Sequence, residues 1–276
     1  MHSTASDGRL TPEAVVARAR EAGLTAIALT DHDTLAGVPA ARAAGESFDI
    51  TVVSGCEFST AAPWGEMHVL GYFLPAGSDR LETFLARCRA DRIRRGQAMV
   101  ARVRALGIPL EFQEVLDQAG GGAVGRPHVA RALVQAGAAR SVQNAFDRFL
   151  GRGRPAYVDK VLPTFREVAE LVHSIGGVVS AAHLKDRGTR PLLQKLQSEG
   201  LDAVETRHPS HDADTRARLT DLALELGLGR SGGSDWHGDA AADETHGSLG
   251  SQDVPYDWVT RLAELRPSGA AFSRNS

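Results

Sequence analysis

The feature of this sequence that most constrains its fold is a repeated alternation of short apolar runs with stretches of helical length. Three of the runs are LTAIALT (24–30), ITVVSGCEFST (50–60) and MHVLGYF (67–73), which have the length and composition of buried strands. The stretch PEAVVARAREAG (12–23) is typical of an amphipathic helix, with Thr11 as a suitable N-cap. Strands that alternate with helices predict βα units around a parallel sheet.

The alternation is interrupted in the middle of the chain and then resumes. Residues 78–155 contain turn signals but no convincing strand, which predicts a helical segment. From residue 164 onward the helical and strand patterns return, and the strands end in AAHL, ETRH and the glycine-rich GGSDWHG. We therefore expect one α/β barrel in two parts, residues 1–77 and 156–268. A helical insertion at 78–155 would act as a lid or substrate domain, and residues 269–276 would form a disordered tail.

The composition excludes several classes of protein. The 276 residues are 42% hydrophobic and 24% charged, which is ordinary for a globular protein large enough to bury a sizeable core. No apolar run approaches the ~20 residues of a membrane helix, and MHSTASDGRL lacks the basic and apolar regions of a signal peptide. Two cysteines and a net charge of −3 indicate neither a disulfide framework nor a general affinity for polyanions. We therefore expect a cytoplasmic protein with no membrane contact and no obligate protein partner.

Residues that bind metals recur at the ends of the expected strands. In a parallel α/β barrel the carboxyl ends of the strands meet on one face, where active sites lie. Imidazole and carboxylate groups are ligands of Zn²⁺, Mn²⁺ and Fe²⁺. A single histidine at a strand end is more often structural, but the recurrence on strand after strand predicts two or three ions, with Glu57 as a bridge. The residues are His32, Glu57, His68, His183, His208, Asp235 and His237.

Six short segments, in order along nearly the whole chain, resemble the motifs of the polymerase and histidinol phosphatase (PHP) superfamily. They are MHSTASDG (1–8), ALTDHD (28–33), SGCEFS (54–59), MHVLGY (67–72), SAAHL (180–184) and GGSDWHG (232–238). The resemblance implies an α/β fold, a distorted (β/α)7 TIM-like barrel interrupted by the helical insertion. It also implies two or three divalent ions, with Mn²⁺ favoured and Fe²⁺ or Zn²⁺ compatible. The metal ligands implied by the motifs are His2, Asp7, His32, Glu57, His68, His183, Asp235 and His237.

Two positions depart from the family pattern. The family has a strand of the form Asp-Leu-His-x-His-Ser, and His2 matches its second histidine, with Met1 at the x position. We therefore expect that the first strand and first histidine are truncated from the sequence as given. A start assigned too late is favoured over a real loss, because every later motif is present. The second departure is AAHL in place of Ala-His-Pro, which affects the rigidity of the loop more than the ligand His183.

Several residues outside the ligand set are candidates for contacting substrate. In VGRPHVARAL, Pro127 begins a helix that Arg126 and His128 flank, and the free N–H groups of a helix N-terminus bind anions. The alternative is that the two side chains only cap and solvate the helix. Arg154 in GRGRPAYV is a further candidate for binding phosphate. His208 in TRHPSHD is the candidate catalytic residue, which would protonate a leaving group.

The basic stretch RCRADRIRRGQAMVARVR (87–104) allows two interpretations. The favoured one is the solvated face of an amphipathic helix. The other is a guide for a polyanionic substrate through Arg92, Arg94 or Arg95. The remaining histidines that we expect at the surface are His173, His211 and His246.

Within the superfamily, the chain is similar to the 3′,5′-nucleoside bisphosphate phosphatases and to the 5′-to-3′ exoribonucleases that act on short RNA. That resemblance implies a metal-dependent phosphoric ester hydrolase, in which metal-activated water attacks a phosphate ester of a nucleotide or the 5′ end of a short RNA. Without the resemblance, the residues indicate only that the protein hydrolyses phosphoesters with the help of metal ions. Two alternatives stay open, a histidinol-phosphate-type phosphatase of the same barrel and a non-catalytic metal-binding PHP accessory domain.

Overall fold

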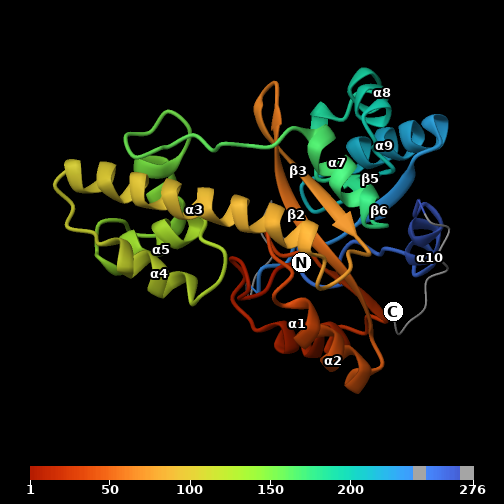
Figure 1. The fold of residues 1–276 in the computed structure, drawn as a ribbon, viewed down its shortest axis with the longest axis horizontal. Helices are drawn as coiled ribbons and strands as arrows, with labels where there is room; N and C mark the ends of the chain where they lie inside the picture. The colour runs from red at the N-terminus through yellow and green to blue at the C-terminus, as the bar shows by residue number, and fades with distance from the viewer. Residues whose placement is uncertain (239–246, 268–276) are drawn as a thin grey trace.

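The computed structural model describes residues 1–238 and 247–267, which form one curled sheet of six strands wrapped by helices (Figure 1). The strands follow the chain in order across the sheet, so that the first and the last are its two edges. They are β1 (Ala26–Leu29), β2 (Thr51–Ala62), β3 (Gly65–Tyr72), β4 (Val178–Ala181), β5 (Ala203–Arg207) and β6 (Gly229–Gly232).

The sheet is mixed and not wholly parallel. β1 pairs with β2 in parallel, as do β4 with β5 and β5 with β6, whereas β3 runs antiparallel to both of its neighbours. The prediction of a parallel sheet is therefore wrong at this strand, because only Pro63 and Trp64 separate β2 from β3. A connection of that length makes a hairpin, whereas a parallel pair needs a crossover of a dozen residues or more.

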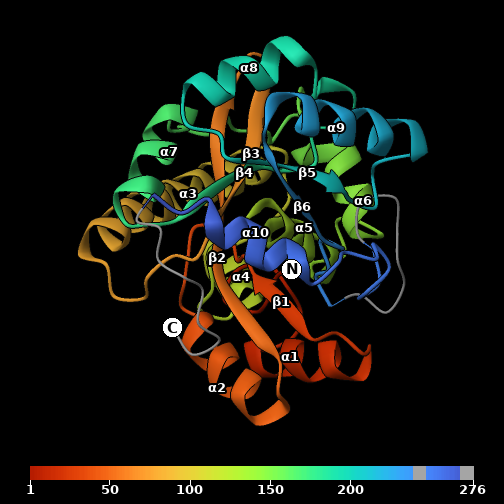
Figure 2. The same cartoon turned by 90° about the vertical axis from the view of Figure 1, so that its right-hand side faces the viewer.

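Helices cover the outer face of the sheet. Figure 2 shows α7, α8 and α9 along one side of the curled sheet and α1 and α2 along the other. The N-cap expected at Thr11 is confirmed, since its side chain accepts a hydrogen bond from the backbone N–H of Ala14. The helices outside the insertion are α1 (Pro12–Glu21), α2 (Val38–Phe48), α7 (Phe165–Ser174), the short η2 (Lys185–Arg187), α8 (Arg190–Ser198), α9 (Ala213–Leu226) and α10 (Asp257–Glu264).

The segment expected as an insertion, residues 78–155, is helical and extends away from the sheet (Figure 1). Its long first helix, α3, joins two apolar cores. Leu81 and Leu85 pack into the core of the barrel, and Met99 and Val103 pack into a separate core of the insertion. The elements are α3 (Asp79–Ala105), α4 (Phe112–Ala119), α5 (Arg126–Gln135), α6 (Val142–Ala145) and the π-helical turn η1 (Phe146–Leu150).

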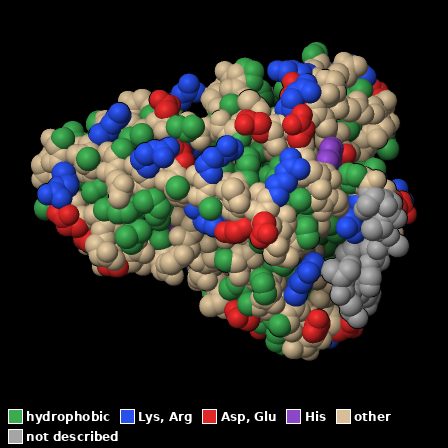
Figure 3. All heavy atoms as spheres, viewed as in Figure 1, with side chains coloured by type: hydrophobic (Ala, Val, Ile, Leu, Met, Phe, Trp, Pro, Cys, Tyr) green, Lys and Arg blue, Asp and Glu red, His purple; other side chains and the backbone are tan. Residues whose placement is uncertain are grey.

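The basic stretch 87–104 lies on α3 and is divided between two environments. Arg94 is exposed and pairs with Asp91, and basic and acidic side chains interleave on the face seen in Figure 3. The solvated-face interpretation therefore holds for Arg94. Arg92 and Arg95 are instead largely buried, 9% exposed at the Arg92 side chain and 6% over the whole of Arg95. Two of the arginines named as substrate guides thus point into the molecule.

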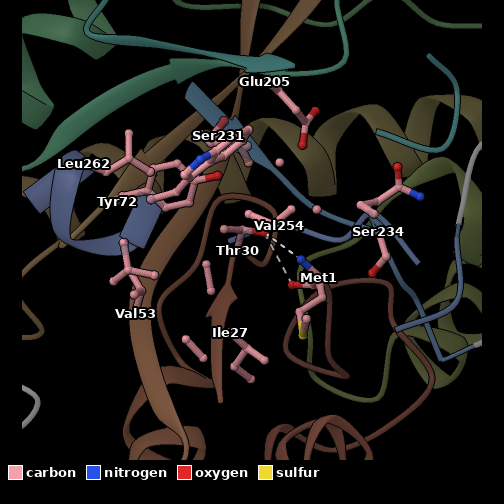
Figure 4. A pocket seen from close by; sticks show the side chains of 18 of the residues that line it. Met1, Ile27, Thr30, Val53, Tyr72, Glu205, Ser231, Ser234, Val254 and Leu262 are labelled. Atoms are coloured by element: carbon pink, nitrogen blue, oxygen red, sulfur yellow. Dashed lines mark hydrogen bonds between the residues drawn. The ribbon is translucent and has the colours of Figure 1, made fainter. Parts of the chain in front are cut away.

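The sheet is open between its edges, β1 and β6, and the first residues of the chain lie across this side. The backbone N–H of Thr30 donates to the Met1 carbonyl at 3.0 Å, and that of His2 donates to the Trp236 carbonyl at 2.9 Å. Beside Met1 lies a cavity of about 290 Å³, lined largely by apolar side chains such as Ile27 (Figure 4). The expected (β/α)7 count is not confirmed, because the described residues contribute six strands and leave the barrel open here.

Two predictions concern residues that the structure does not describe. The tail expected to be disordered (269–276) and His246 lie outside the described residues. Among the helices in residues 1–238 and 247–267, none has the length and apolar character needed to cross a membrane.

Candidate metal centre

The N-terminal loop carries two of the candidate ligands, His2 and Asp7, and the buried carboxylate of Asp31 holds this loop in place. Oδ1 of Asp31 accepts from the backbone N–H of Ser3 at 2.7 Å and from the hydroxyl of Ser6 at 2.6 Å. Oδ2 accepts from the hydroxyl of Ser3 at 2.7 Å. These three bonds fasten the loop to the carboxyl end of β1, beside the other strand ends.

Glu57 lies at the centre of the candidate ligands. Its Oε2 is 2.9 Å from Nε2 of His2. Its Oε1 is 2.6 Å from Nδ1 of His68 and 3.3 Å from Nε2 of His183. The two oxygens thus face different histidines, which is the arrangement that a carboxylate needs in order to bridge two ions.

Three groups of side chains each place their ligand atoms within 4.8 Å of one another. His2 and Glu57 each belong to two of the groups, so the groups overlap and form one cluster. Together they contain all eight ligands that the motifs implied. The groups are His2, Asp7, His32 and His237; Glu57, His68 and His183; and His2, Glu57 and Asp235.

The charges around the cluster favour a cation. Burial opposes protonation of His2, but hydrogen bonds to Asp235 and Glu57 raise its pKa to about 10. Burial also opposes protonation of His68, but the charge of Glu57 raises the pKa of His68 to about 9. Burial instead lowers the pKa of His32 to about 3, and its buried Nδ1 has no hydrogen-bond partner among the described residues. The carboxylates beside His2 and His68 thus stabilise a positive charge, and the neutral ring of His32 has a nitrogen that makes no hydrogen bond among the described residues. Both properties suit the binding of divalent cations.

Two candidate ligands and the residue after a third have strained backbone. Asp33, His183 and Asp235 have positive φ values of 52°, 31° and 48°. Non-glycine residues seldom adopt this region, and they keep it where the surrounding structure enforces it, often at functional sites. No pattern in the sequence signals these conformations.

Arg92 reaches the cluster from the insertion. Its Nε lies 2.6 Å from Oδ2 of Asp33, and the two side chains are only 9% and 6% exposed. Its Nη2 makes no hydrogen bond within the part of the chain that the structure describes. Its Nη1 lies 3.8 Å from the place where a Cβ on Gly125 would stand, directly before α5. A buried guanidinium therefore lies between a ligand-bearing loop and the N-terminus of α5.

The three predicted phosphate-binding residues occupy different environments. Arg126 opens α5, and its guanidinium lies 5.7 Å from the centre of the Phe146 ring. His128 is buried, burial lowers its pKa to about 4, and its Nδ1 accepts from the backbone N–H of Gly125 at 2.9 Å. His128 therefore caps its own helix. Arg154 is exposed in the turn that follows η1.

His208, the predicted catalytic residue, differs from the candidate ligands in which of its ring nitrogens carries the hydrogen. The backbone N–H of Ser210 donates to its Nδ1 at 3.1 Å, so this nitrogen holds a lone pair and Nε2 carries the ring hydrogen. Nε2 is buried, lies 3.8 Å from Oδ2 of Asp235, and has no hydrogen-bond partner among the described residues. His208 therefore presents a hydrogen to the cluster, where a ligand would present a lone pair.

His211 was predicted to lie at the surface, and this prediction is wrong. It is buried, its Nε2 accepts from the backbone N–H of Lys185 at 3.3 Å, and its Nδ1 faces the Thr206 carbonyl at 3.4 Å. His211 thus braces the loops that follow β4 and β5. His173 is partly exposed and pairs with Asp202 at 2.8 Å.

The residues that support the ligands were not among those predicted from the sequence. Asp31 adjoins a ligand in TDHD, and its position beside His32 is a signal that could have identified it. The pairing of Asp33 with Arg92 joins residues 59 positions apart, and no local pattern reveals it.

Glu57 and His68, expected at strand ends, lie within β2 and β3, and the other candidate ligands lie in loops outside the strands. An open α/β barrel that gathers imidazole and carboxylate groups from its strands and loops in overlapping clusters defines the class of metal-dependent hydrolases. The PHP domain matches residues 1–211, more than half of the chain, and the protein belongs to the PHP family. The resemblance drawn from the six motifs is thereby confirmed.

Individual relatives agree with this assignment. The chain is 34% identical over 243 residues to the 5′-3′ exoribonuclease Rnm of Salmonella typhimurium, covering 86% of this chain and 83% of that one. It is 31% identical over 265 residues to the 3′,5′-nucleoside bisphosphate phosphatase of Chromobacterium violaceum, covering 92% and 90%. A crystal structure described as a metal-dependent phosphoesterase, from Bifidobacterium adolescentis, matches with a TM-score of 0.88 at 31% identity, covering 96% and 94%. The chain is therefore a hydrolase of phosphate esters, and its family implies divalent metals.

Proposed function

We propose that this protein hydrolyses phosphate esters of nucleotides, either 3′,5′-nucleoside bisphosphates or the 5′ ends of short RNA. The observation that carries the proposal is the buried guanidinium of Arg92 between the ligand cluster and the N-terminus of α5. A substrate with a second phosphate group matches such a place, because the first phosphate would lie at the ions. The two curated relatives are named as enzymes for substrates of this kind.

We place two or three divalent ions, with Mn²⁺ favoured and Fe²⁺ or Zn²⁺ compatible, in the three ligand groups. When bound, such ions neutralise the charge on a phosphoryl group and lower the pKa of water. Glu57 holds two of the groups together, since its two oxygens face different histidines. His2 serves the group around Asp7 and the group around Asp235.

The second phosphate group is assigned to the N-terminus of α5. Arg92 and Arg126 offer guanidinium N–H groups there. The backbone adds little, because Pro127 has no N–H and the N–H of Gly125 already donates to His128. His128 shapes this turn by capping the helix through Nδ1. Arg154, because it is exposed, suits a later phosphate of an RNA chain.

His208 is assigned the role of hydrogen-bond donor to the leaving group, because the neutral ring with its hydrogen on Nε2 has no proton to transfer. Its Nε2 hydrogen faces the cluster, and its orientation is held through the bond between Nδ1 and the N–H of Ser210. A leaving nucleoside oxygen accumulates negative charge as the ester bond breaks, and a hydrogen bond from the Nε2–H of His208 would stabilise that charge.

The test is phosphate release, in Mn²⁺, from adenosine 3′,5′-bisphosphate, a 5′-phosphorylated RNA tetramer and histidinol phosphate. We expect Arg92→Met to raise KM for the bisphosphate about 10-fold or more, because charged hydrogen bonds to the second phosphate are lost. Arg126→Ala should act in the same direction without removing the partner of Asp33. The matched control is Arg94→Met, an exposed arginine of the same helix, which should leave KM unchanged.

Two results would contradict the proposal. Release from histidinol phosphate, with none from the nucleotides, would favour the alternative phosphatase of the same barrel. A wild-type KM for the bisphosphate in both Arg92→Met and Arg126→Ala would remove the second phosphate from this place.

A further inference from the structure

Glu66 and Lys160 form an ion pair next to the candidate ligand His68, outside the ligand cluster itself. Oε1 of Glu66 lies 3.2 Å from Nε2 of His68 and also accepts a hydrogen bond from Nζ of Lys160. Nζ of Lys160 donates a second bond to the hydroxyl of Ser59 at 3.0 Å. The side chains of Lys160 and Glu66 are 13% and 23% exposed, so the pair is largely enclosed.

The two ring nitrogens of His68 face in opposite directions. Nδ1 faces the cluster, 2.6 Å from Oε1 of Glu57 and 3.2 Å from Nε2 of His183. Nε2 faces Glu66, which lies two residues earlier on β3 and therefore on the same side of the sheet. A carboxylate next to Nε2 holds the hydrogen on that nitrogen and leaves the lone pair of Nδ1 for an ion.

Lys160 is held by the insertion. It lies in the segment 157–161, which leads from the insertion back to the barrel and runs beside α3. The backbone carbonyl of Val158 accepts from Nε of Arg95 at 2.7 Å, and the carbonyl of Tyr157 accepts from Arg102. The backbone N–H of Val161 donates to Asp91 at 3.3 Å. Three side chains of α3 thus fasten the segment that carries Lys160.

The place of Lys160 is an unfavourable one for a lysine. Burial, then the charge of Arg92, lower the pKa of Lys160 to about 8, although Glu66 opposes them. An enclosed ammonium beside other cations is costly unless a close partner compensates. Glu66 is that partner, so the location of the lysine and the location of the carboxylate depend on each other.

We infer that Glu66 is the positioning residue of His68, and that Lys160 sets the place of Glu66, so that the insertion is coupled to the ligand group Glu57, His68 and His183. The inference rests on the metal assignment of the proposed function and is independent of which phosphate ester is the substrate.

The experiment is a calorimetric titration of the full chain, stripped with a chelator, with Mn²⁺. Glu66→Ala should weaken one class of Mn²⁺ sites about 10- to 100-fold, the range found for removing such outer partners. Glu66→Gln should restore part of that affinity, because its amide oxygen still accepts from His68. Lys160→Met should weaken the same class of sites by less, and it should have no further effect in the double variant with Glu66→Ala.

The control variant is Glu225→Gln, which breaks the exposed Arg190–Glu225 pair far from the cluster and should leave the Mn²⁺ titration unchanged. An unchanged Mn²⁺ affinity in Glu66→Ala, together with a lowered melting temperature, would reduce the pair to a structural role and overturn the inference. Additive effects of the two substitutions would show that Lys160 does not act through Glu66. A wild-type chain that takes up neither Mn²⁺ nor Zn²⁺ would overturn the metal centre and this inference with it.

Discussion

At the scale of single residues, the ligand cluster depends on side chains that do not themselves face an ion. Asp31 accepts three hydrogen bonds from the loop that carries His2 and Asp7, and it is only 1% exposed. The loop is only a few residues long and belongs to no helix or strand. The conformation of the loop therefore depends on the hydrogen bonds that the Asp31 carboxylate accepts from Ser3 and Ser6.

Asp31→Asn should weaken Mn²⁺ binding about 10-fold and lower activity with it. The amide NH2 cannot accept, so the bond from the Ser3 hydroxyl is reversed or lost, and the charge that strengthens the bonds to Ser3 and Ser6 is removed, at a cost of about 1–3 kcal/mol. The measurements are a Mn²⁺ titration and thermal unfolding.

The control for this substitution is Asp212→Ala, which removes the N-cap of α9 away from the cluster. It should lower the melting temperature without a change in Mn²⁺ affinity. If Asp31→Asn lost stability but kept wild-type Mn²⁺ affinity, the hydrogen bonds of Asp31 would be structural and would not position the ligands.

The eight candidate ligands could be named from the sequence because they fall in short motifs that resemble those of a known family, whereas the strand pattern alone did not include His2 and Asp7. The residues that support these ligands could not be named in this way. Glu66 in GEMH and Lys160 in YVDKV are ordinary surface residues by pattern, and their pairing joins positions 94 apart. Contacts of this range depend on how the insertion folds back, which no local spacing encodes.

At the scale of elements, the pair His173–Asp202 ties α7 to the sheet. Nε2 of His173 lies 2.8 Å from Oδ2 of Asp202, and the same oxygen accepts from the backbone N–H of Val179 at 2.7 Å. The hydrogen bond to Asp202 raises the pKa of His173 above its ordinary value of 6.5. A raised pKa in the folded state stabilises the fold fully below 6.5, and this contribution is lost as the pH rises through the higher value.

His173→Ala should therefore lower the free energy of unfolding more at about pH 5.5 than at about pH 8.5, by about 1 kcal/mol or less for a partly exposed pair. Urea unfolding of both proteins at the two pH values measures this difference. Gln197→Ala is the control, because it removes an uncharged bond from α8 to the Leu226 carbonyl and its cost should not depend on pH. Equal losses at the two pH values for His173→Ala would mean that the pair contributes no charge-dependent stability.

Local signals identified most helices and strands but not the direction of every strand. Thr11 and Thr164 cap α1 and α7 through bonds within three residues, so the beginnings of these helices can be read from the sequence. The run MHVLGYF was predicted as a strand and is β3. It runs antiparallel because only Pro63 and Trp64 connect it to β2, which is too short for a parallel crossover. The prediction followed the βα pattern and did not take this connection length into account.

At the scale of the whole molecule, the insertion is set against the ligand loop by a contact between backbones. The N–H of Ala123 donates to the Ala5 carbonyl at 3.0 Å, and Nη2 of Arg131 donates to the Asp7 carbonyl at 3.2 Å. The close approach requires glycine at position 122, where a Cβ would stand 2.5 Å from the Thr4 carbonyl oxygen. The family resemblance predicted a barrel with an insertion, but only the folded chain reveals where the two touch.

Gly122→Ala should separate the insertion from the ligand loop, because the added methyl meets backbone that cannot rotate away. We expect activity to fall about 10- to 100-fold, since displacements of about 1 Å at a distance from the reacting atoms have effects of that size. Steady-state kinetics with the bisphosphate measure the loss. Gly137→Ala is the control, since its positive φ of 70° strains any side chain but open space surrounds it between α5 and α6. That variant should lose stability and keep its kinetics. Wild-type kinetics in Gly122→Ala would instead mean that catalysis does not require this contact, and that the insertion influences the ions only through Arg92 and Lys160.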